Sequence, residues 1–216
     1  MVAVHVFLVR HGETALNAAG VLRGQLDIPL NATGEAEAAA LGEVFRGVPL
    51  SAVVSSPLKR AFDTARPVAA ASRAILTIDD RLSDRFYGEW AGHSLEQVEE
   101  RFGSIDSAPL VEAWQLLEAR TEEAFLNAVA TGEASGAAVG DVKAGVALVT
   151  HDAVLRTLLG RLLPALSSAR LDLPTGSWSE LVPAATGKQW RAVHLGELPE
   201  SGRRPALYVS GEWSGP

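Results

Sequence analysis

The chain has 216 residues, of which 47% are hydrophobic and 21% are charged, and its formal net charge is −7. This length fits one domain with a sizeable core, and the composition is globular rather than disordered. The acidic balance, without any block of like charges, argues against a nucleic-acid or anionic-membrane partner, because both bind basic patches. The absence of cysteine excludes disulfides, thiolate nucleophiles and cysteine-bound metals.

The opening segment, residues 1–9, is apolar but does not predict a signal peptide or a membrane anchor. It lacks a basic leader and a small-residue cleavage site, and Arg10 ends it after too few residues to span a bilayer. We therefore expect this segment to be a buried strand and the protein to be cytoplasmic.

Strand and helix patterns alternate in the first half of the chain. Residues 2–9 are β-branched and apolar on both faces, which is typical of a central strand of a parallel sheet. A polar loop with glycine and proline follows over residues 10–31. The next predicted elements are a helix capped by Thr33 and extending to about Phe45, a short strand over 52–55, a helix from Pro57 to about Ala71, and an edge strand over 74–78.

The second half begins with a polar and aromatic stretch without periodicity, residues 79–92. The elements expected after it are helices over 94–102 and 110–130, a surface loop over 131–143, a strand over 145–150, a helix over 153–163 with Asp152 as its N-cap, and a strand pair over 177–182 and 189–195 around a turn at 184–188. The tail, residues 197–216, contains one apolar run over 206–209 and predicts no element.

This alternation predicts an α/β fold, a three-layer sandwich with a mainly parallel central sheet flanked by helices. We expect one domain over residues 1–216, since no linker divides the chain. Within it, residues from about 79 to 143 are expected to contribute a small helical cap.

Histidines and arginines follow three of the predicted strands. Arg10 and His11 follow the first strand, Arg60 lies just after the second, and His151 follows the strand over 145–150. Ligands of open α/β sheets bind beyond the carboxyl ends of the strands, so these side chains should converge. Arginine binds phosphate oxygens bidentately, and a neutral imidazole is a competent nucleophile at phosphorus. The pattern therefore indicates a phosphate site.

Four sequence motifs carry a resemblance to a known family. They are Leu8-Val9-Arg10-His11-Gly12-Glu13-Thr14 with Asn17, continuing through Gly24, Asp27, Pro29, Leu30 and Gly34; Ser55-Ser56-Pro57-Leu58-Lys59-Arg60-Ala61 with Thr64-Ala65; Leu82-Ser83-Asp84-Arg85-Phe86-Tyr87-Gly88-Glu89-Trp90-Ala91-Gly92; and Val149-Thr150-His151-Asp152. In this order they resemble the histidine phosphatase superfamily, which includes the cofactor-dependent phosphoglycerate mutases. The resemblance spans roughly residues 4 to 182.

The resemblance implies a role for each matching residue. His11 attacks phosphorus and becomes a phosphohistidine, which water then hydrolyses, without a metal or other cofactor. Arg10, Arg60 and His151 hold the phosphoryl oxygens and stabilise the transition state. The resemblance places Asn17 against the phosphoryl group and makes Asp84 the acid that protonates the leaving oxygen. Three further candidates for substrate binding are Arg23, Arg85 and Tyr87.

Two departures from the family pattern concern the acid and the pocket wall. The family's usual acid is a glutamate, and Asp84 is shorter, so its reach falls by roughly 1 Å, a misplacement that can cost on the order of 100-fold in rate. Glu89 is a weaker candidate for the same role. Ala15 and Leu16 replace the more usual residues before Asn17, which changes the pocket wall more than the chemistry.

Simpler readings of some residues stay open. Asp84 would be a structural carboxylate if it paired with Arg81 or Arg85. Asn17 would be a turn-former. The remaining histidines, which are His5, His93 and His194, are expected to be structural or incidental.

Three functions compete on the sequence alone. The leading hypothesis is a phosphomonoesterase that transfers the phosphoryl group of a small phosphate ester from His11 to water. A phosphoglycerate mutase is the alternative, because mutases of the family carry a run similar to residues 84–88. Against it, the segment 94–110 is short and acidic, whereas mutases have a longer basic insertion there. A catalytically impaired phospho-ligand binding protein is the third hypothesis. The natural substrate, and whether the protein is a homodimer, stay open.

Overall fold

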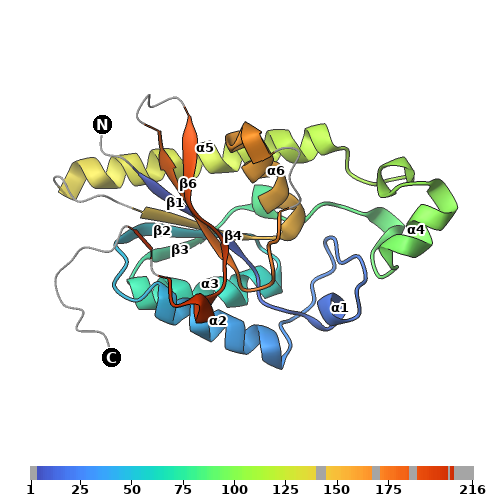
Figure 1. Ribbon diagram of the computed structural model, residues 1–216, viewed down its shortest axis with the longest axis horizontal. Helices are drawn as coiled ribbons and strands as arrows, with labels where there is room; N and C mark the ends of the chain where they lie inside the picture. Colours follow the sequence, from blue (N-terminus) through green and yellow to red (C-terminus); the bar gives the residue numbers. More distant parts are fainter. Residues whose placement is uncertain (1–3, 140–144, 167–170, 185–188, 204, 207–216) are drawn as a thin grey trace.

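A six-stranded sheet forms the centre of the computed structural model, which describes residues 4–139, 145–166, 171–184, 189–203 and 205–206 (Figure 1). Its strands are β1 (His5–Arg10), β2 (Leu50–Ser55), β3 (Ile75–Ile78), β4 (Gly145–Thr150), β5 (Trp178–Pro183) and β6 (Trp190–Glu197). Their order across the sheet is β3-β2-β4-β1-β5-β6. Strands β1 to β4 pair in parallel, and β5 and β6 add an antiparallel edge.

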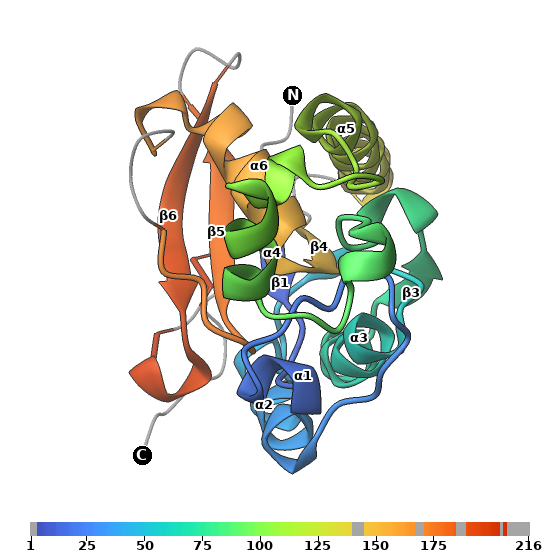
Figure 2. The same ribbon diagram turned by 90° about the vertical axis from the view of Figure 1, so that its right-hand side faces the viewer.

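Helices cover both faces of this sheet, as Figure 2 shows. The α-helices are α1 (Ala15–Ala18), α2 (Ala32–Val44), α3 (Lys59–Ser72), α4 (Leu95–Phe102), α5 (Trp114–Val139) and α6 (Asp152–Leu162). Helices α2 and α3 lie on one face, and α5 and α6 lie on the other. The predicted α/β fold with a mainly parallel, helix-flanked sheet is confirmed. Within the described ranges, no helix combines the length and hydropathy needed to cross a bilayer.

Short 3-10 helices connect these elements. They are η1 (Asp80–Leu82), η2 (Gly88–Trp90), η3 (Ile105–Ser107), η4 (Pro164–Leu166) and η5 (Pro199–Ser201). Helix α4 and η3 lie beyond the carboxyl ends of the parallel strands, in the segment expected to form a cap (Figure 1). The single domain with a cap over about 79–143 stays a prediction.

The two helical layers pack on alternating residues of the central strands. Val6 and Leu8 of β1 pack with the α5 and α6 side chains, whereas Phe7 and Val9 pack with those of α2 and α3. All four are almost fully buried. Burying such a side chain stabilises the fold by roughly 1.5–3 kcal/mol. Because helices cover both faces of the sheet, the sequence of β1 is apolar at successive positions instead of alternating with polar residues.

Three predicted helix starts were wrong by one or two residues. The side chain of Asn31, not Thr33, caps α2, and it accepts the Gly34 N–H at 2.9 Å. Helix α3 begins at Lys59 rather than Pro57, and the carboxylate of Asp27 accepts the Lys59 N–H at 2.7 Å. Asp152 is the first residue of α6, not its cap. The start of α3 therefore depends on a carboxylate that is 32 positions away in the sequence. Local sequence patterns do not reveal such a contact.

The predicted surface loop over 131–143 was also wrong, because α5 continues to Val139. Glycine suggested a loop there, but Gly132 is buried where a Cβ would lie 2.7 Å from Val4 Cγ1 and 2.9 Å from Val146 Cγ2. The glycine therefore lets the helix approach the sheet. Residues 140–143 lie outside the described part of the chain.

The carboxyl-terminal strand pair is confirmed as β5 and β6, although residues 185–188 of the predicted turn lie outside the described ranges. The tail adds η5, and beyond it the Ala206 N–H donates to the buried Glu180 carboxylate at 2.7 Å. The rest of the apolar run over 206–209 is outside the description. Helix α1, within the predicted loop over 10–31, had no clear sequence signal.

The loop after β1 is pressed against the first turn of α2. A Cβ on Gly12 would lie 2.5 Å from the Gly34 carbonyl oxygen, and a Cβ on Gly34 would overlap the Glu13 backbone. Asn31 and Glu13 add backbone and side-chain hydrogen bonds across the same contact. The two glycines thus allow a backbone-to-backbone contact that no other residue permits.

We expect Gly34→Ala to destabilise the fold by about 2 kcal/mol or more, because the clash is with backbone and exceeds the helix-propensity gain of alanine. The melting temperature should fall by about 4–8 °C. Gly160→Ala in α6 is the matched control, since a Cβ there meets nothing within 4 Å. It should raise stability by roughly 0.5–1 kcal/mol. Equal melting temperatures for the two variants would contradict the packing argument.

Candidate active site

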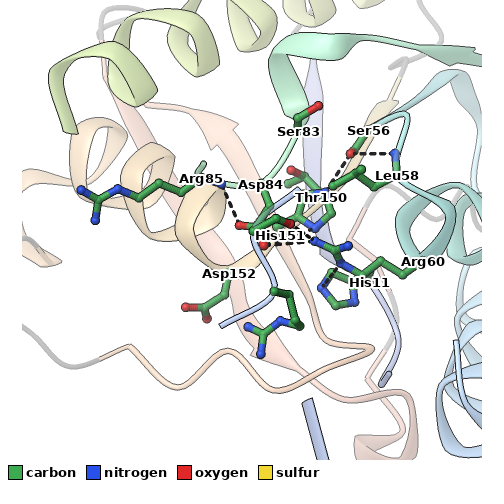
Figure 3. A network of polar contacts seen from close by, with 12 residues as sticks. His11, Ser56, Leu58, Arg60, Ser83, Asp84, Arg85, Thr150, His151 and Asp152 are labelled. Carbon is green, nitrogen blue, oxygen red and sulfur yellow. Dashed lines mark hydrogen bonds and ion pairs between the residues drawn. The ribbon is translucent and has the colours of Figure 1, made fainter. Parts of the chain in front are cut away.

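Four predicted site residues meet beyond the carboxyl ends of β1, β2 and β4 (Figure 3). His11 follows β1, Arg60 lies in the first turn of α3 after β2, and His151 follows β4. Asp84 reaches the same place from the segment between η1 and η2. His11, Arg60 and His151 are fully buried and Asp84 is 4% exposed, so charges here act in a low dielectric.

His11 is held in one tautomer. Its Nδ1 lies 2.7 Å from the carbonyl oxygen of Gly12, which can only accept, so Nδ1 carries the proton. Nε2 is therefore unprotonated, and its lone pair accepts a long hydrogen bond from the Arg60 Nε–H at 3.3 Å. Burial, followed by the charge of Arg60, lowers the pKa of His11 well below its usual value. The ring is neutral at neutral pH.

Arg60 contacts two other residues of the cluster, His11 and Asp84. Its guanidinium donates to the carbonyl oxygens of Gly24 and Leu26 at 2.7 and 2.8 Å. It also contacts the Asp84 carboxylate at 3.1 Å and His11 Nε2. One buried cation thus joins the loop over 24–26, the Asp84 carboxylate and the His11 imidazole.

Asp84 is buried beside Arg60 rather than paired with its neighbours in sequence. Its Oδ1 accepts the Arg85 N–H at 2.9 Å. Burial raises the pKa of Asp84, although the charges of Arg60 and Arg23 oppose the rise. The alternative pairings of this carboxylate are absent among the described residues, because Arg81 pairs with Asp79 and Arg85 with Asp106. Glu89, the weaker candidate, is exposed.

His151 faces His11, with ring centroids 5.1 Å apart. Its Nε2 lies 2.7 Å from the Ser56 hydroxyl, and its Nδ1 lies 4.0 Å from Asp84 Oδ2. Burial and the charge of Arg60 lower the pKa of His151 well below its usual value. The buried Nδ1 has no hydrogen-bond partner among the described residues.

Arg10 and Asn17 flank the cluster. Arg10 donates to the Leu173 carbonyl and lies 3.6 Å from the Asp152 carboxylate, while its buried Nε has no partner in the described chain. The Asn17 side-chain oxygen accepts from the backbone N–H and the hydroxyl of Thr14. The Asn17 backbone N–H in turn donates to the Thr14 hydroxyl oxygen, which completes the capping box of α1 with Thr14 as the N-cap. The Asn17 side-chain amide nitrogen makes no hydrogen bond to the described residues.

The three further substrate-binding candidates are placed differently. Arg23 is half-buried, its charge lowers the pKa of both His11 and His151, and its buried Nε has no partner among the described residues. Burial, followed by the charge of Asp84, raises the pKa of Tyr87. Arg85 points away from the cluster (Figure 3), where it pairs with Asp106 at 2.7 Å and stacks on Trp114. The structure does not bring its guanidinium to the site.

The remaining histidines lie elsewhere. His5 Nδ1 contacts the buried Glu180 carboxylate at 2.6 Å, and His194 Nε2 lies 3.9 Å from the same group. His93 is exposed. Nowhere in the described ranges do three or more histidine or carboxylate side chains gather so that they could hold a metal ion.

Sequence reasoning missed the groups that orient the site. The Gly12, Gly24 and Leu26 carbonyls leave no trace in a residue pattern, because every residue has one. Ser56 carries a weak signal, as a hydroxyl immediately after a buried strand. Its contact with His151, 95 positions later, depends on the pairing of β2 with β4.

Residues 6–197 match the profile of the histidine phosphatase superfamily (branch 1). The chain belongs to this superfamily. The predicted resemblance is therefore confirmed, and the protein is an enzyme of the phosphatase or mutase type. The match covers all four residues of the buried cluster.

The similar proteins include both a phosphatase and a probable phosphoglycerate mutase. The chain is 29% identical over 195 residues to a glucosyl-3-phosphoglycerate phosphatase of Mycobacterium tuberculosis, covering 84% of this chain and 81% of the relative. It is 34% identical over 188 residues to a probable phosphoglycerate mutase of Citrobacter koseri, covering 82% and 84%. The structure of the mycobacterial glucosyl-3-phosphoglycerate phosphatase with inorganic phosphate superposes with a TM-score of 0.77 at 25% identity, covering 91% and 98%.

The neutral buried histidines predict how stability depends on pH. Below a pKa of about 6.5 the unfolded chain protonates His11 while the folded chain does not, so stability falls as pH falls. Each such group contributes a slope of about 1.4 kcal/mol per pH unit. His11→Gln should therefore flatten the curve of unfolding free energy against pH by about this amount between roughly pH 5.5 and 4.5.

Denaturant unfolding at a series of pH values measures this slope. His93→Gln is the control, because that side chain is exposed in a loop, and it should leave the slope unchanged. A His11→Gln curve parallel to that of the parent protein would contradict the neutral state assigned to His11.

Proposed function

We propose that this enzyme is a phosphomonoesterase that hydrolyses a small phosphorylated metabolite through a phosphohistidine on His11. The observation that carries the proposal is the tautomer of His11. Its Nδ1–H is fixed on the Gly12 carbonyl, so the Nε2 lone pair faces Arg60 at the centre of the cluster. A neutral, oriented imidazole with a cation beside it suits attack on phosphorus.

In the first half of the reaction, His11 Nε2 forms a bond to phosphorus as the bond to the ester oxygen breaks. The leaving oxygen takes a proton from Asp84, giving the free alcohol and a phosphohistidine. The raised pKa of Asp84 supports this role, because an acid catalyst must hold its proton until the bond breaks. Its contact with Arg60 and its distance of 4.0 Å from His151 offset the concern that aspartate is too short.

Arg10, Arg60 and His151 bind the phosphoryl oxygens in this proposal. Charge on these oxygens is stabilised by fixed donors that need no reorganisation in a buried site. Arg23 adds a further positive charge without a carboxylate partner among the described residues, so we assign it to the substrate as well. We also assign the Asn17 amide nitrogen and Tyr87 to substrate binding.

In the second half, water attacks the phosphohistidine and gives its proton to Asp84. The bond between phosphorus and Nε2 breaks, which releases phosphate and regenerates His11. A phosphate complex of the related mycobacterial phosphatase supports a pocket for this product. The inactive-binder hypothesis loses its main support, since Asp84 lies within the cluster rather than apart from it.

Hydrolysis is favoured over mutase chemistry by the segment over 94–110. Arg101 is its single basic residue, and this side chain stacks on Trp90 and Phe102 instead of reaching the cluster. Arg85, the basic residue of the preceding motif, is bound to Asp106. The segment therefore offers little to grip a phosphoglycerate or to shield a phosphohistidine from water. Phosphoglycerate mutase remains the second candidate, because mutases are among the relatives.

His11→Ala should lower hydrolysis of p-nitrophenyl phosphate by about 10⁴-fold or more, since the nucleophile is lost. Phosphate release in EDTA is the measurement, with His93→Ala as the matched control at full activity. Rapid quenching in base should trap phosphate on the parent protein but not on His11→Ala. Retained activity of His11→Ala, or loss of activity in EDTA, would contradict the mechanism.

Two assays in parallel would distinguish a phosphatase from a mutase. A panel of phosphorylated metabolites is tested for phosphate release, and 3-phosphoglycerate is also tested for isomerisation. We expect phosphate release to exceed isomerisation. Faster isomerisation would assign the enzyme to the mutases, and activity in neither assay would favour a binding protein.

Asp84→Asn should affect poor leaving groups most, because only these need a proton as the bond breaks. We expect a loss of about 100-fold or more on an alkyl phosphate and a much smaller loss on p-nitrophenyl phosphate. Glu89→Gln, which alters the exposed alternative acid, should leave both rates unchanged. Equal losses of Asp84→Asn on the two substrates would remove Asp84 from the role of acid.

A further inference from the structure

Ser56 lies between β2 and α3 with its hydroxyl fully buried against His151. Within the described chain, the hydroxyl contacts His151 Nε2 at 2.7 Å and the backbone N–H of Leu58 at 3.3 Å (Figure 3). No role in the reaction proposed above is assigned to this serine. Its position behind the imidazole, on the side away from Asp84, suggests one.

The donors and acceptors around the hydroxyl determine where its proton points. A serine hydroxyl has one proton to donate and two lone pairs to accept with. The Leu58 N–H can only donate, so it occupies a lone pair. Within the described chain, His151 Nε2 is then the one acceptor in reach of the hydroxyl proton. A buried hydroxyl proton without an acceptor is costly, so Ser56 donates to Nε2.

This donation settles the state of His151. If Nε2 accepts, its lone pair is occupied by the serine proton and the imidazole proton resides on Nδ1. Nδ1 is the buried atom without a partner, and it faces the Asp84 side of the cluster at 4.0 Å. An unpaired N–H at this position can donate a hydrogen bond to an oxygen atom of a bound ligand.

We propose that Ser56 is a positioning residue that fixes the Nδ1–H tautomer of His151, so that this nitrogen donates to a phosphoryl oxygen of the substrate. The inference rests on the proposed function, in which His151 binds that oxygen. Without the serine, the ring is free to place its proton on Nε2. The Nδ1 lone pair then meets the anionic oxygen and repels it.

The two histidines thus share a tautomer but present opposite atoms to the substrate. The Gly12 carbonyl takes the Nδ1–H of His11 and leaves Nε2 as a nucleophile. The Ser56 hydroxyl occupies Nε2 of His151 and leaves Nδ1–H as a donor. A backbone acceptor and a side-chain donor therefore separate the roles of two rings that lie 5.1 Å apart.

The charged and titratable groups around His151 decide how this state responds to pH. They are Arg60 from α3, His11 after β1, Asp84, Arg23 and Arg120 from α5. Burial and the cations among them lower the pKa of His151 well below its usual value, so the ring is neutral and its tautomer matters at neutral pH.

The direct test reads the tautomer in the resting protein. Long-range ¹H–¹⁵N correlation spectra distinguish the protonated nitrogen of a neutral imidazole from the unprotonated one. His151→Asn assigns the signals of His151 by their disappearance. We expect protonated Nδ1 and unprotonated Nε2, and the reverse would overturn the proposal. This measurement needs no activity, so it stands apart from any failure of the proposed function.

The kinetic test compares Ser56→Ala with Ser56→Thr. Loss of the hydroxyl should lower kcat/KM on p-nitrophenyl phosphate about tenfold at pH 7.5, the scale of one buried hydrogen bond. The threonine hydroxyl should restore most of the activity, and the spectrum of Ser56→Ala should show the His151 proton on Nε2 in part of the molecules. A merely structural role would lower the activity without changing the tautomer.

Two controls complete the test. Ser55→Ala removes the neighbouring buried hydroxyl, which donates to the Ser56 carbonyl and not to His151, and it should leave the tautomer of His151 unchanged. His151→Asn should lose far more activity than Ser56→Ala. Full activity of His151→Asn would refute the role of His151 itself, whereas an unchanged His151 tautomer in Ser56→Ala would refute the serine alone.

Discussion

The buried guanidinium of Arg60 is the interaction on which the site depends. A fully buried cation is costly unless its donors are satisfied, and here two carbonyls, a carboxylate and an imidazole satisfy them. The same contacts fix the loop over 24–26, the Asp84 carboxylate and the His11 imidazole relative to one another. Arg60 also helps to keep both histidines neutral. One side chain therefore sets both the geometry and the protonation of its neighbours.

Burial has opposite effects on the two kinds of titratable group in the cluster. It disfavours the charged form of each, so the pKa values of His11 and His151 fall while that of Asp84 rises. Neutral imidazoles therefore lie beside a carboxyl group whose pKa is above its usual value. In the proposed reaction, these opposite shifts bring the nucleophile and the acid closer to a common working pH.

Much of the fold could be predicted from the sequence because strand and helix patterns are local. The apolar run of β1 and the alternation of elements indicated a covered parallel sheet, and strand ends then brought His11, Arg60 and His151 together. The errors arose where distant residues decide the outcome. Asp27 satisfies the start of α3, and Gly132 is buried against the sheet rather than exposed in a loop. The contact of Ser56 with His151 likewise exists only because β2 and β4 are neighbours.

The close contact of Gly12 with Gly34 has a consequence for how the enzyme meets its substrate. With backbone against backbone, the segment bearing His11 cannot shift without displacing the whole of α2. If His11 is the nucleophile, as proposed, it is consequently preorganised, and little reorganisation energy is needed on its side of the reaction. Conformational adjustment to different substrates would then come from the segment between Asp84 and η3. In that case substrate preference can change in this segment while the geometry around His11 stays fixed.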